Sequence, residues 1–172
     1  MSRAFVRDDA PEAPLFIPPR APLPPGATNV VTPRGLALLR AEKAALEAER
    51  ARLDGDERDD AKRERAVLVG RLGELSVRLA SARVVDPQRQ PHDEVRFGAT
   101  VTLRTRTGAQ PGEERRITVV GVDEADAASG RVAFTAPIAR AITGKRVGET
   151  GALRTARGEE VLEVVSITYE PA

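Results

Sequence analysis

Hydrophobic residues change their spacing near residue 90, which divides the chain into a helical half and a strand-rich half. In the first half they recur every three, four or seven residues within segments of strong helix formers, so they share one face of a helix. The repeating positions are Leu39, Leu46 and Leu53 in a first segment and Leu68, Leu72, Leu75, Leu79 and Ala82 in a second. Two helices joined by a tight loop bury such faces against each other only if they run antiparallel. The pattern therefore predicts an antiparallel coiled-coil hairpin over residues 32–86.

The start of this hairpin and its loop carry clear signals. Thr32 is a good N-cap, and Pro33 suits the first position of a helix. Gly55 favours a left-handed turn out of the first helix, and Asp56 is expected to cap the second.

The second helix is expected to end just before Pro87, because proline disfavours helical backbone in the residue that precedes it. Gly70 and Gly73 lie inside this helix and weaken it locally, by up to about 1 kcal/mol each.

From Val95 onward, hydrophobic and polar residues alternate, which is the period of a β-strand. The expected strands are 95–104, 115–122, 131–135, 151–155 and 160–169, with a short helix over 136–142. A polar linker, 87–94, precedes them. The predicted fold class is α+β, in which residues 95–172 form a small, strongly twisted antiparallel sheet with one short helix packed against it.

Residues 1–31 contain seven prolines and read as a disordered tail, since proline removes backbone donors and favours extended backbone. Two apolar islands, Ala4-Phe5-Val6 and Leu15-Phe16-Ile17, leave open the alternative that the tail carries short docking motifs.

Composition excludes several classes of function. The chain has no cysteine and a single histidine, His92, which disfavours a disulfide framework, a thiolate site and a His-rich zinc site. The net charge of +1 gives no whole-chain argument for binding nucleic acid, and aromatic residues are too scarce to form stacking platforms. We expect His92 to be solvated in the linker. No signal peptide or membrane span is visible, so the expected location is the cytoplasm.

Charge gathers at the loop between the two helices. Residues 54–60 hold five carboxylates and one arginine, whereas the stem is basic, with Arg50, Arg52, Arg63 and Arg65 nearest the loop. Asp56 and Asp59, three residues apart at a helix start, are expected to project to one side within about 5–6 Å. Such a pair can share a hard cation such as Mg²⁺, though weakly. The alternative is a solvated polar loop.

A second acidic group, Asp123, Glu124 and Asp126, falls in a turn between strands. No histidine or nucleophile lies near it in sequence. We therefore interpret it as structural or as contacting a partner, rather than as catalytic.

Several blocks resemble the Gre family of bacterial transcription elongation factors (GreA/GreB). Phe97-Gly98-Ala99-Thr100-Val101, the block from Val119 to Asp126 and the block from Pro137 to Glu149 resemble the family's F-G-x-x-V, I-V-G-x-D-E-A-D and S-P-x-A-R-A-L-x-G-K-x-V-G-D/E. Thr32-Pro33-Arg34-Gly35 and the block from Ala82 to Asp86 also match. The loop Gly55-Asp56-Glu57-Arg58-Asp59-Asp60-Ala61 resembles the family's G-D-x-x-E-N-A, with Asp in place of Glu at 59. The resemblance spans residues 32–169.

The resemblance implies an FKBP-like C-terminal domain that docks on RNA polymerase at the rim of its secondary channel. The docking residues it implies are Asp123, Glu124, Asp126, Pro137, Ile138 and Arg140. The coiled coil would enter the channel, where Asp56 and Asp59 would help hold the second Mg²⁺ and stimulate the polymerase's own cleavage of backtracked RNA. The protein would then be a monomeric accessory factor without an intrinsic cofactor, and its hairpin would lie close to nascent RNA or DNA.

Two other functions stay open at this point, and a third is disfavoured. The first helix, about 20 residues or roughly 30 Å long, is shorter than the family's usual arm, which allows docking without cleavage. A prolyl isomerase is disfavoured, because Phe97, Phe134 and Tyr169 are too few aromatics to wall a prolyl pocket. The basic stem allows nonspecific DNA binding, which would depend steeply on salt.

Overall fold

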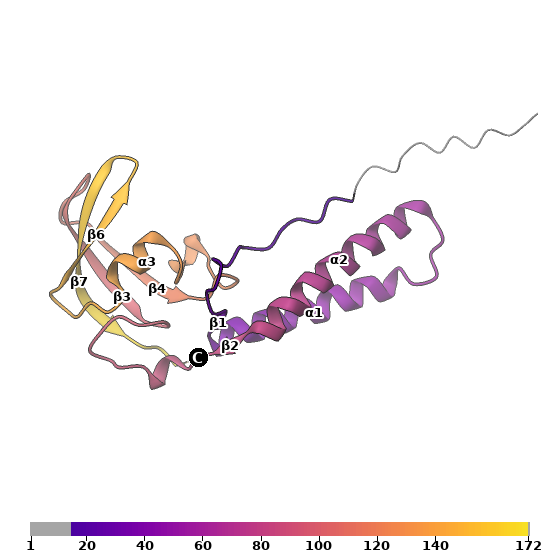
Figure 1. The fold of residues 1–172 in the computed structure, drawn as a ribbon, viewed down its shortest axis with the longest axis horizontal. Coiled ribbons are helices and arrows are strands. Elements are labelled where there is room, and N and C mark those ends of the chain that lie inside the picture. Colours follow the sequence, from indigo (N-terminus) through magenta and orange to yellow (C-terminus); the bar gives the residue numbers. More distant parts are fainter. Residues whose placement is uncertain (1–14, 172) are drawn as a thin grey trace, which may run out of the picture.

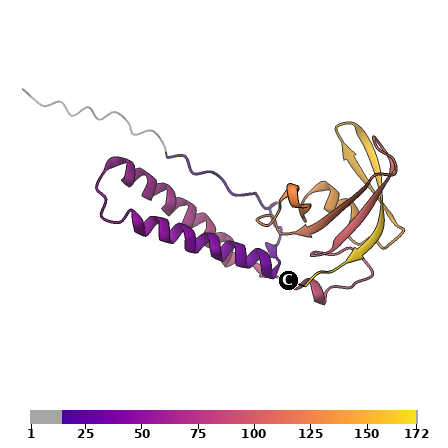
Figure 2. The same cartoon turned by 180° about the vertical axis from the view of Figure 1, so that it is seen from behind.

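The computed structural model describes residues 15–171, in which a helical hairpin projects from a curled sheet (Figure 1). Helix α1 spans Pro33–Arg52 and helix α2 spans Asp59–Ser81. The Thr32 hydroxyl caps α1 by accepting a hydrogen bond from the Gly35 N–H at 2.9 Å, as its sequence signal predicts. The hairpin seen from behind in Figure 2 points away from the sheet over its whole length. No helix among residues 15–171 is long and apolar enough to cross a membrane.

The hairpin buries the repeating leucines between its two helices. The buried members of this cluster are Val31, Leu39, Leu46, Leu68, Leu72 and Leu75, with Leu36, Leu53, Leu79 and Ala82 partly buried around them. All the positions identified from the spacing therefore lie in one core. Antiparallel packing of the two helices is present as expected, while the supercoil of a coiled coil stays a prediction.

The prediction that Asp56 caps α2 is wrong. The N-cap is Arg58, which makes no side-chain capping hydrogen bond, and Asp56 lies two residues before it. Gly55 adopts the left-handed conformation (φ 80°), as expected. Arg58 has extended backbone, so helical geometry begins only at Asp59. Asp56 is consequently not part of the helix, and helical spacing does not relate it to Asp59.

The C-terminal half contains a five-stranded sheet in the order β5-β4-β3-β7-β6. The strands are β3 (Thr100–Thr107), β4 (Glu114–Val120), β5 (Arg131–Ala133), β6 (Thr150–Thr155) and β7 (Gly158–Thr168). Helix α3 (Pro137–Ile142) packs against the sheet through Ala139 and Ile142, which are fully buried. The core between them includes Val101, Leu103, Val119, Leu162 and Val164.

The sheet departs from the prediction in two places. It is not wholly antiparallel, because β5 pairs in parallel with β4, Thr118 lying opposite Arg131. The connection through residues 121–130, with a short 3₁₀ turn at Ala127–Ser129, brings the chain back to run in the same direction. The first strand begins at Thr100 rather than Val95, since Gly98 has φ 87° and interrupts extended backbone.

A two-residue parallel ladder joins the base of the hairpin. Strand β1 (Val30–Val31) pairs with β2 (Arg83–Val84), and the Arg83 N–H donates to the Asn29 carbonyl at 2.8 Å. The tail predicted over residues 1–31 therefore extends too far, because Val30 and Val31 form a strand. The second helix ends at Ser81, earlier than expected, because the β-branched Val31 and Val84 pair across the hairpin base. Residues 1–14 of the predicted tail lie outside the described residues.

Candidate functional site

The far end of the hairpin places Asp56 in a tight loop held by two arginines. The Arg58 side chain reaches back to both carboxylate oxygens, with Nη2 at 2.6 Å from Oδ2 and Nε at 3.0 Å from Oδ1. The Arg58 N–H also donates to Oδ1 at 3.0 Å. From α2, the Arg65 guanidinium donates to the Asp56 carbonyl at 2.8 Å. The backbone at Asp56 is thus fixed from the stem, while its carboxylate is paired locally.

Pairing with Arg58 lowers the pKa of the Asp56 carboxyl. The hydrogen bonds from the Arg58 side chain, followed by the one from its backbone N–H, lower the pKa of Asp56 from 3.8 to about 2. A lowered pKa means that the charged form is favoured, so the ion pair persists at neutral pH and is lost only as the pH falls through about 2.

This pKa is directly testable. In a titration of the side-chain carboxyl carbons followed by NMR, we expect Asp56 to show a midpoint near 2. In Arg58→Ala the midpoint should rise toward 3.8, because the dominant donor has been removed. Lys62→Ala, which removes the partner of Glu57 instead, serves as the control and should leave the Asp56 midpoint unchanged. An unchanged midpoint in Arg58→Ala would contradict the pairing.

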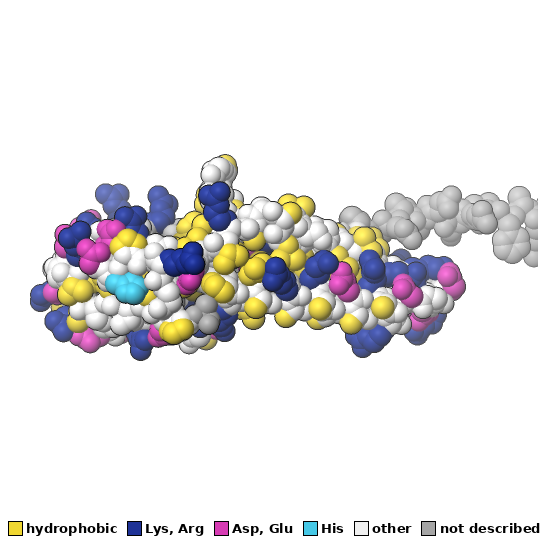
Figure 3. All heavy atoms as spheres, turned by 90° about the horizontal axis from the view of Figure 1, so that it is seen from below, with side chains coloured by type: hydrophobic (Ala, Val, Ile, Leu, Met, Phe, Trp, Pro, Cys, Tyr) yellow, Lys and Arg dark blue, Asp and Glu magenta, His cyan; other side chains and the backbone are white. Residues whose placement is uncertain are grey.

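The remaining charges at the tip face water. Asp59 is exposed in the first turn of α2, and Arg50, Arg52 and Arg63 lie along the stem, all three exposed. Figure 3 shows basic and acidic side chains together around the far end of the hairpin. Among residues 15–171, no three His, Cys, Asp or Glu side chains converge as a metal site. The tip could therefore supply one or two oxygens to an ion held mainly elsewhere.

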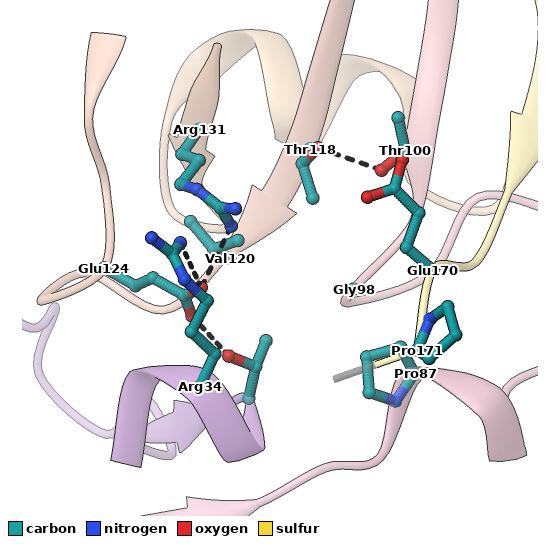
Figure 4. Close-up of a pocket in the computed structure, with 11 residues that line it drawn as sticks. Arg34, Pro87, Gly98, Thr100, Thr118, Val120, Glu124, Arg131, Glu170 and Pro171 are labelled. Atoms are coloured by element: carbon teal, nitrogen blue, oxygen red, sulfur yellow. Dashed lines mark hydrogen bonds and ion pairs between the residues drawn. The ribbon is translucent and has the colours of Figure 1, made fainter. Parts of the chain in front are cut away.

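Asp123 and Glu124, predicted as docking residues, point into the chain rather than out of it (Figure 4 shows Glu124). The Glu124 side chain is only 2% exposed and pairs with Arg131 at 3.1 Å and Arg34 at 3.4 Å. It also accepts a hydrogen bond from the Thr32 hydroxyl. We call this contact between the start of α1 and the sheet module the Glu124 joint.

Asp123 makes a second inward contact. Its side chain is 7% exposed and forms ion pairs with Arg20 at 3.0 Å and Arg78 at 3.3 Å. Both carboxylates are therefore engaged within the chain. A docking role for them stays a prediction, but direct contact with a partner would require these ion pairs to open.

The other predicted docking residues lie at or near the surface. Asp126 is exposed and accepts a hydrogen bond from the Ala128 N–H at 3.1 Å, which closes the turn after β4. On α3, Pro137 and Arg140 lie at the surface, whereas Ile138 packs against the sheet core. The N-cap of α3, Ala136, makes no side-chain capping hydrogen bond.

A shallow apolar depression beside α3 was not anticipated from the sequence. Phe97 and Phe134 meet edge to face in it, with ring centroids 6.0 Å apart, and Arg140 and Thr143 also line it. His92, expected to be solvated, is exposed, and its ring stacks on Tyr169 at 5.0 Å.

Known proteins are similar to this chain over most of its length. Residues 90–169 match the family model described as "Transcription elongation factor, GreA/GreB, C-term". The protein named transcription elongation factor GreA of a Nitratiruptor species is 37% identical over 134 residues, which cover 75% of this chain and 80% of that protein. The GreA of Hyphomonas neptunium is 34% identical over 155 residues, covering 81% and 97%. This chain belongs to the GreA/GreB family.

Solved structures give weaker matches. The GreA factor homolog 1 (Gfh1) of Thermus thermophilus matches with a TM-score of 0.39 and 22% identity, covering 83% of this chain and 99% of that one. A GreA/GreB elongation factor from Nitrosomonas europaea matches with a TM-score of 0.41 and 20% identity, with the same coverage.

Membership of the GreA/GreB family confirms the resemblance identified from the motifs. The Glu124 joint connects two of those motif blocks. Thr32 and Glu124 belong to separate motif blocks, 92 residues apart, yet they share a buried hydrogen bond. A Cβ placed on Gly35 would lie 2.8 Å from Glu124 Oε2, so the absence of a side chain at Gly35 makes room for that carboxylate. Sequence reasoning missed this contact, because nothing in either block indicates the other as its partner.

Proposed function

We propose that this protein binds bacterial RNA polymerase, enters its secondary channel with the helical hairpin and regulates elongation by stimulating cleavage of backtracked RNA. The observation that carries the proposal is the position of the Asp56 carboxylate at the far end of the hairpin, on a loop whose backbone is anchored by Arg65. Family membership supports it, since the relatives are named transcription elongation factors.

In this proposal Asp56 and Asp59 would contribute oxygens to a Mg²⁺ ion that the polymerase holds with its own ligands. Carboxylate oxygens suit this hard cation. When bound, Mg²⁺ supplies activation of water and stabilisation of charge on the phosphoryl oxygens. The protein's own part is to present the carboxylates, and Arg58 would have to release Asp56 before that carboxylate could face the ion.

Docking is assigned to the parts of the sheet module formed by α3 and by the turn after β4. Asp126, Pro137, Ile138 and Arg140 lie at or near the surface there. Ile138 belongs to a helix fixed on the sheet core, so it offers a rigid contact. Asp123 and Glu124 would act indirectly, by holding the hairpin in position.

A second candidate function is docking without cleavage, in which the protein competes with other secondary-channel factors or alters elongation. Two observations favour it. The Arg58 side chain engages both oxygens of Asp56, which competes with any cation. Helix α1 has 20 residues, and its length of roughly 30 Å limits how far the tip can reach.

Cleavage of RNA in stalled, backtracked elongation complexes tests the first proposal. We expect the wild type to shorten the RNA and Asp56→Ala/Asp59→Ala to do so at least about tenfold more slowly, a loss of about 1.4 kcal/mol of transition-state stabilisation. Arg58→Ala should raise the rate, because it frees the Asp56 carboxylate.

Binding to polymerase, measured by co-purification, is the control and should be equal for all these variants. Shortened RNA from the double variant at the wild-type rate would overturn the tip mechanism. Equal binding with no cleavage by the wild type or by Arg58→Ala would establish the docking-only function instead.

A further inference from the structure

The segment before β1 lies along the hairpin and contacts it at several points, although its prolines predict a disordered tail. In Figures 1 and 2 this indigo segment extends from the hairpin base beside the helices. We call residues 17–23 the strap. Three contacts hold the strap.

The first contact is the packing of Ile17 on α2. Ile17 lies over Gly70, where an added Cβ would overlap the end of the Ile17 side chain. Glycine is the poorest helix former after proline, so a glycine in mid-helix needs a reason from packing. The strap provides one at Gly70. Gly73, one turn further along, has open space around it and makes no such contact.

The second contact is a forked ion pair made by Arg20. Its Nη1 and Nη2 donate to the two carboxylate oxygens of Glu42 on α1, at 2.9 and 3.0 Å. The same guanidinium donates to Asp123 Oδ1 from Nη2 at 3.0 Å and from Nε at 3.2 Å. Bidentate pairs of this kind fix orientation as well as distance. Arg20 therefore joins the hairpin directly to the sheet module, and its side chain is only 17% exposed.

The third contact comes from α2. The Arg78 side chain, 11% exposed, places Nη1 at 3.3 Å from Asp123 Oδ2, while Nη2 donates to the Ala21 carbonyl at 2.5 Å. Asp123 thus lies between an arginine of the strap and an arginine of the hairpin. The two arginines, Arg20 and Arg78, balance the two carboxylates, Glu42 and Asp123, in charge.

We infer that the strap is a brace that fixes the direction of the hairpin relative to the sheet, and that Arg20 is a positioning residue for the tip. Small rotations at the hairpin base matter, because the hairpin is roughly 30 Å long and a rotation of about 10° would displace the tip by about 5 Å. Metal ligation tolerates only tenths of an ångström. The consequence for cleavage rests on the proposed function, whereas the brace itself does not.

The direction of the hairpin can be measured on the full chain without polymerase. The sequence contains no cysteine, so Asp54→Cys at the tip and Arg157→Cys in the turn between β6 and β7 give two specific sites for spin labels. Both positions are exposed. Pulsed electron paramagnetic resonance then reports the distribution of distances between the labels.

Four proteins are compared in this doubly labelled background: the parent, Arg20→Ala, Gly70→Leu and Gly73→Leu. The parent should give a narrow distribution, and Arg20→Ala and Gly70→Leu should broaden or shift it by about 5 Å, the displacement of a hairpin of roughly 30 Å rotated by about 10°. Gly73→Leu is the matched control, because it makes the same change in the same helix where nothing is displaced. Circular dichroism confirms that the helices remain in each variant.

Distributions that stay narrow and unshifted in both Arg20→Ala and Gly70→Leu would overturn the brace. A shift of equal size in Gly73→Leu would also overturn it, because the effect would then not depend on the contact between Ile17 and Gly70. With polymerase, Arg20→Ala should lower RNA cleavage at unchanged binding. If the wild type does not cleave at all, the proposed function fails while the distance measurement still decides the brace.

Discussion

Replacing Glu124 by alanine is expected to lower the free energy of unfolding by about 3 kcal/mol, the loss typical of removing one partner from a buried ion pair. The carboxylate is almost fully buried and holds Arg131, Arg34 and the Thr32 hydroxyl. The low end of the usual range applies because Arg34, 49% exposed, can turn to water once its partner is gone. Urea unfolding followed by circular dichroism measures the change.

Glu170→Ala provides the matched control. Glu170 pairs with Arg116 at 2.6 Å, but the two side chains are 63% and 64% exposed, so the loss should be below about 1 kcal/mol. If the two variants lost equal stability, the Glu124 joint would be no more than a surface ion pair. The Glu170–Arg116 distance, 2.6 Å, is no longer than the Glu124–Arg131 distance, 3.1 Å. The main difference between the two ion pairs is therefore burial, which this comparison isolates.

Replacing Leu75 by alanine is expected to cost between about 2 and 5 kcal/mol, the range found for cavities left in well-packed cores. Leu75 is fully buried in the cluster that includes Leu39 and Leu72, between the two helices. Alanine is the better helix former, so propensity does not account for any of the expected loss. Unfolding in urea is again the measurement, with the midpoint and the slope both reported.

Leu38→Ala removes the same atoms from the outer face of α1, where Leu38 is 45% exposed. Its loss should stay below about 1 kcal/mol, since little apolar surface returns to water and no cavity forms. A small loss for Leu75→Ala, similar to that for Leu38→Ala, would show that the hairpin core packs loosely. The difference between the two variants therefore measures the packing of the seam.

Local rules accounted for the hairpin and for most of the strands. Leucines at helical spacing must share a face, and the face they share is buried here. Thr32 caps α1, and Gly55 takes the left-handed turn, because caps and turns depend on the residue at one position. The prediction failed at Asp56, where an equally local competitor, Arg58, holds the carboxylate outside the helix.

Contacts between distant segments could not be read from the sequence. Asp123 and Glu124 stand in a turn rich in acids, which indicates a polar surface, yet their partners Arg20 and Thr32 lie 103 and 92 residues away. Any of the chain's many arginines could have paired with them, and sequence spacing does not rank such choices. The contacts of the strap could not be read from the sequence either, because its prolines indicate only extended backbone. The surface at Gly70 on which Ile17 packs exists only once α2 has formed.

The amino-acid sequence was thus sufficient for the two halves of the chain, the helical hairpin with its acidic tip, and the family to which the protein belongs. These follow from periodicity, capping and motif spacing, all of which act over a few residues. Only the tertiary structure decided how the halves are joined, because a buried charge needs a partner from whichever segment the fold brings beside it. The pairing of Asp56 with Arg58 is local, but residue types alone did not rank it above helix capping, and the structure resolved that choice.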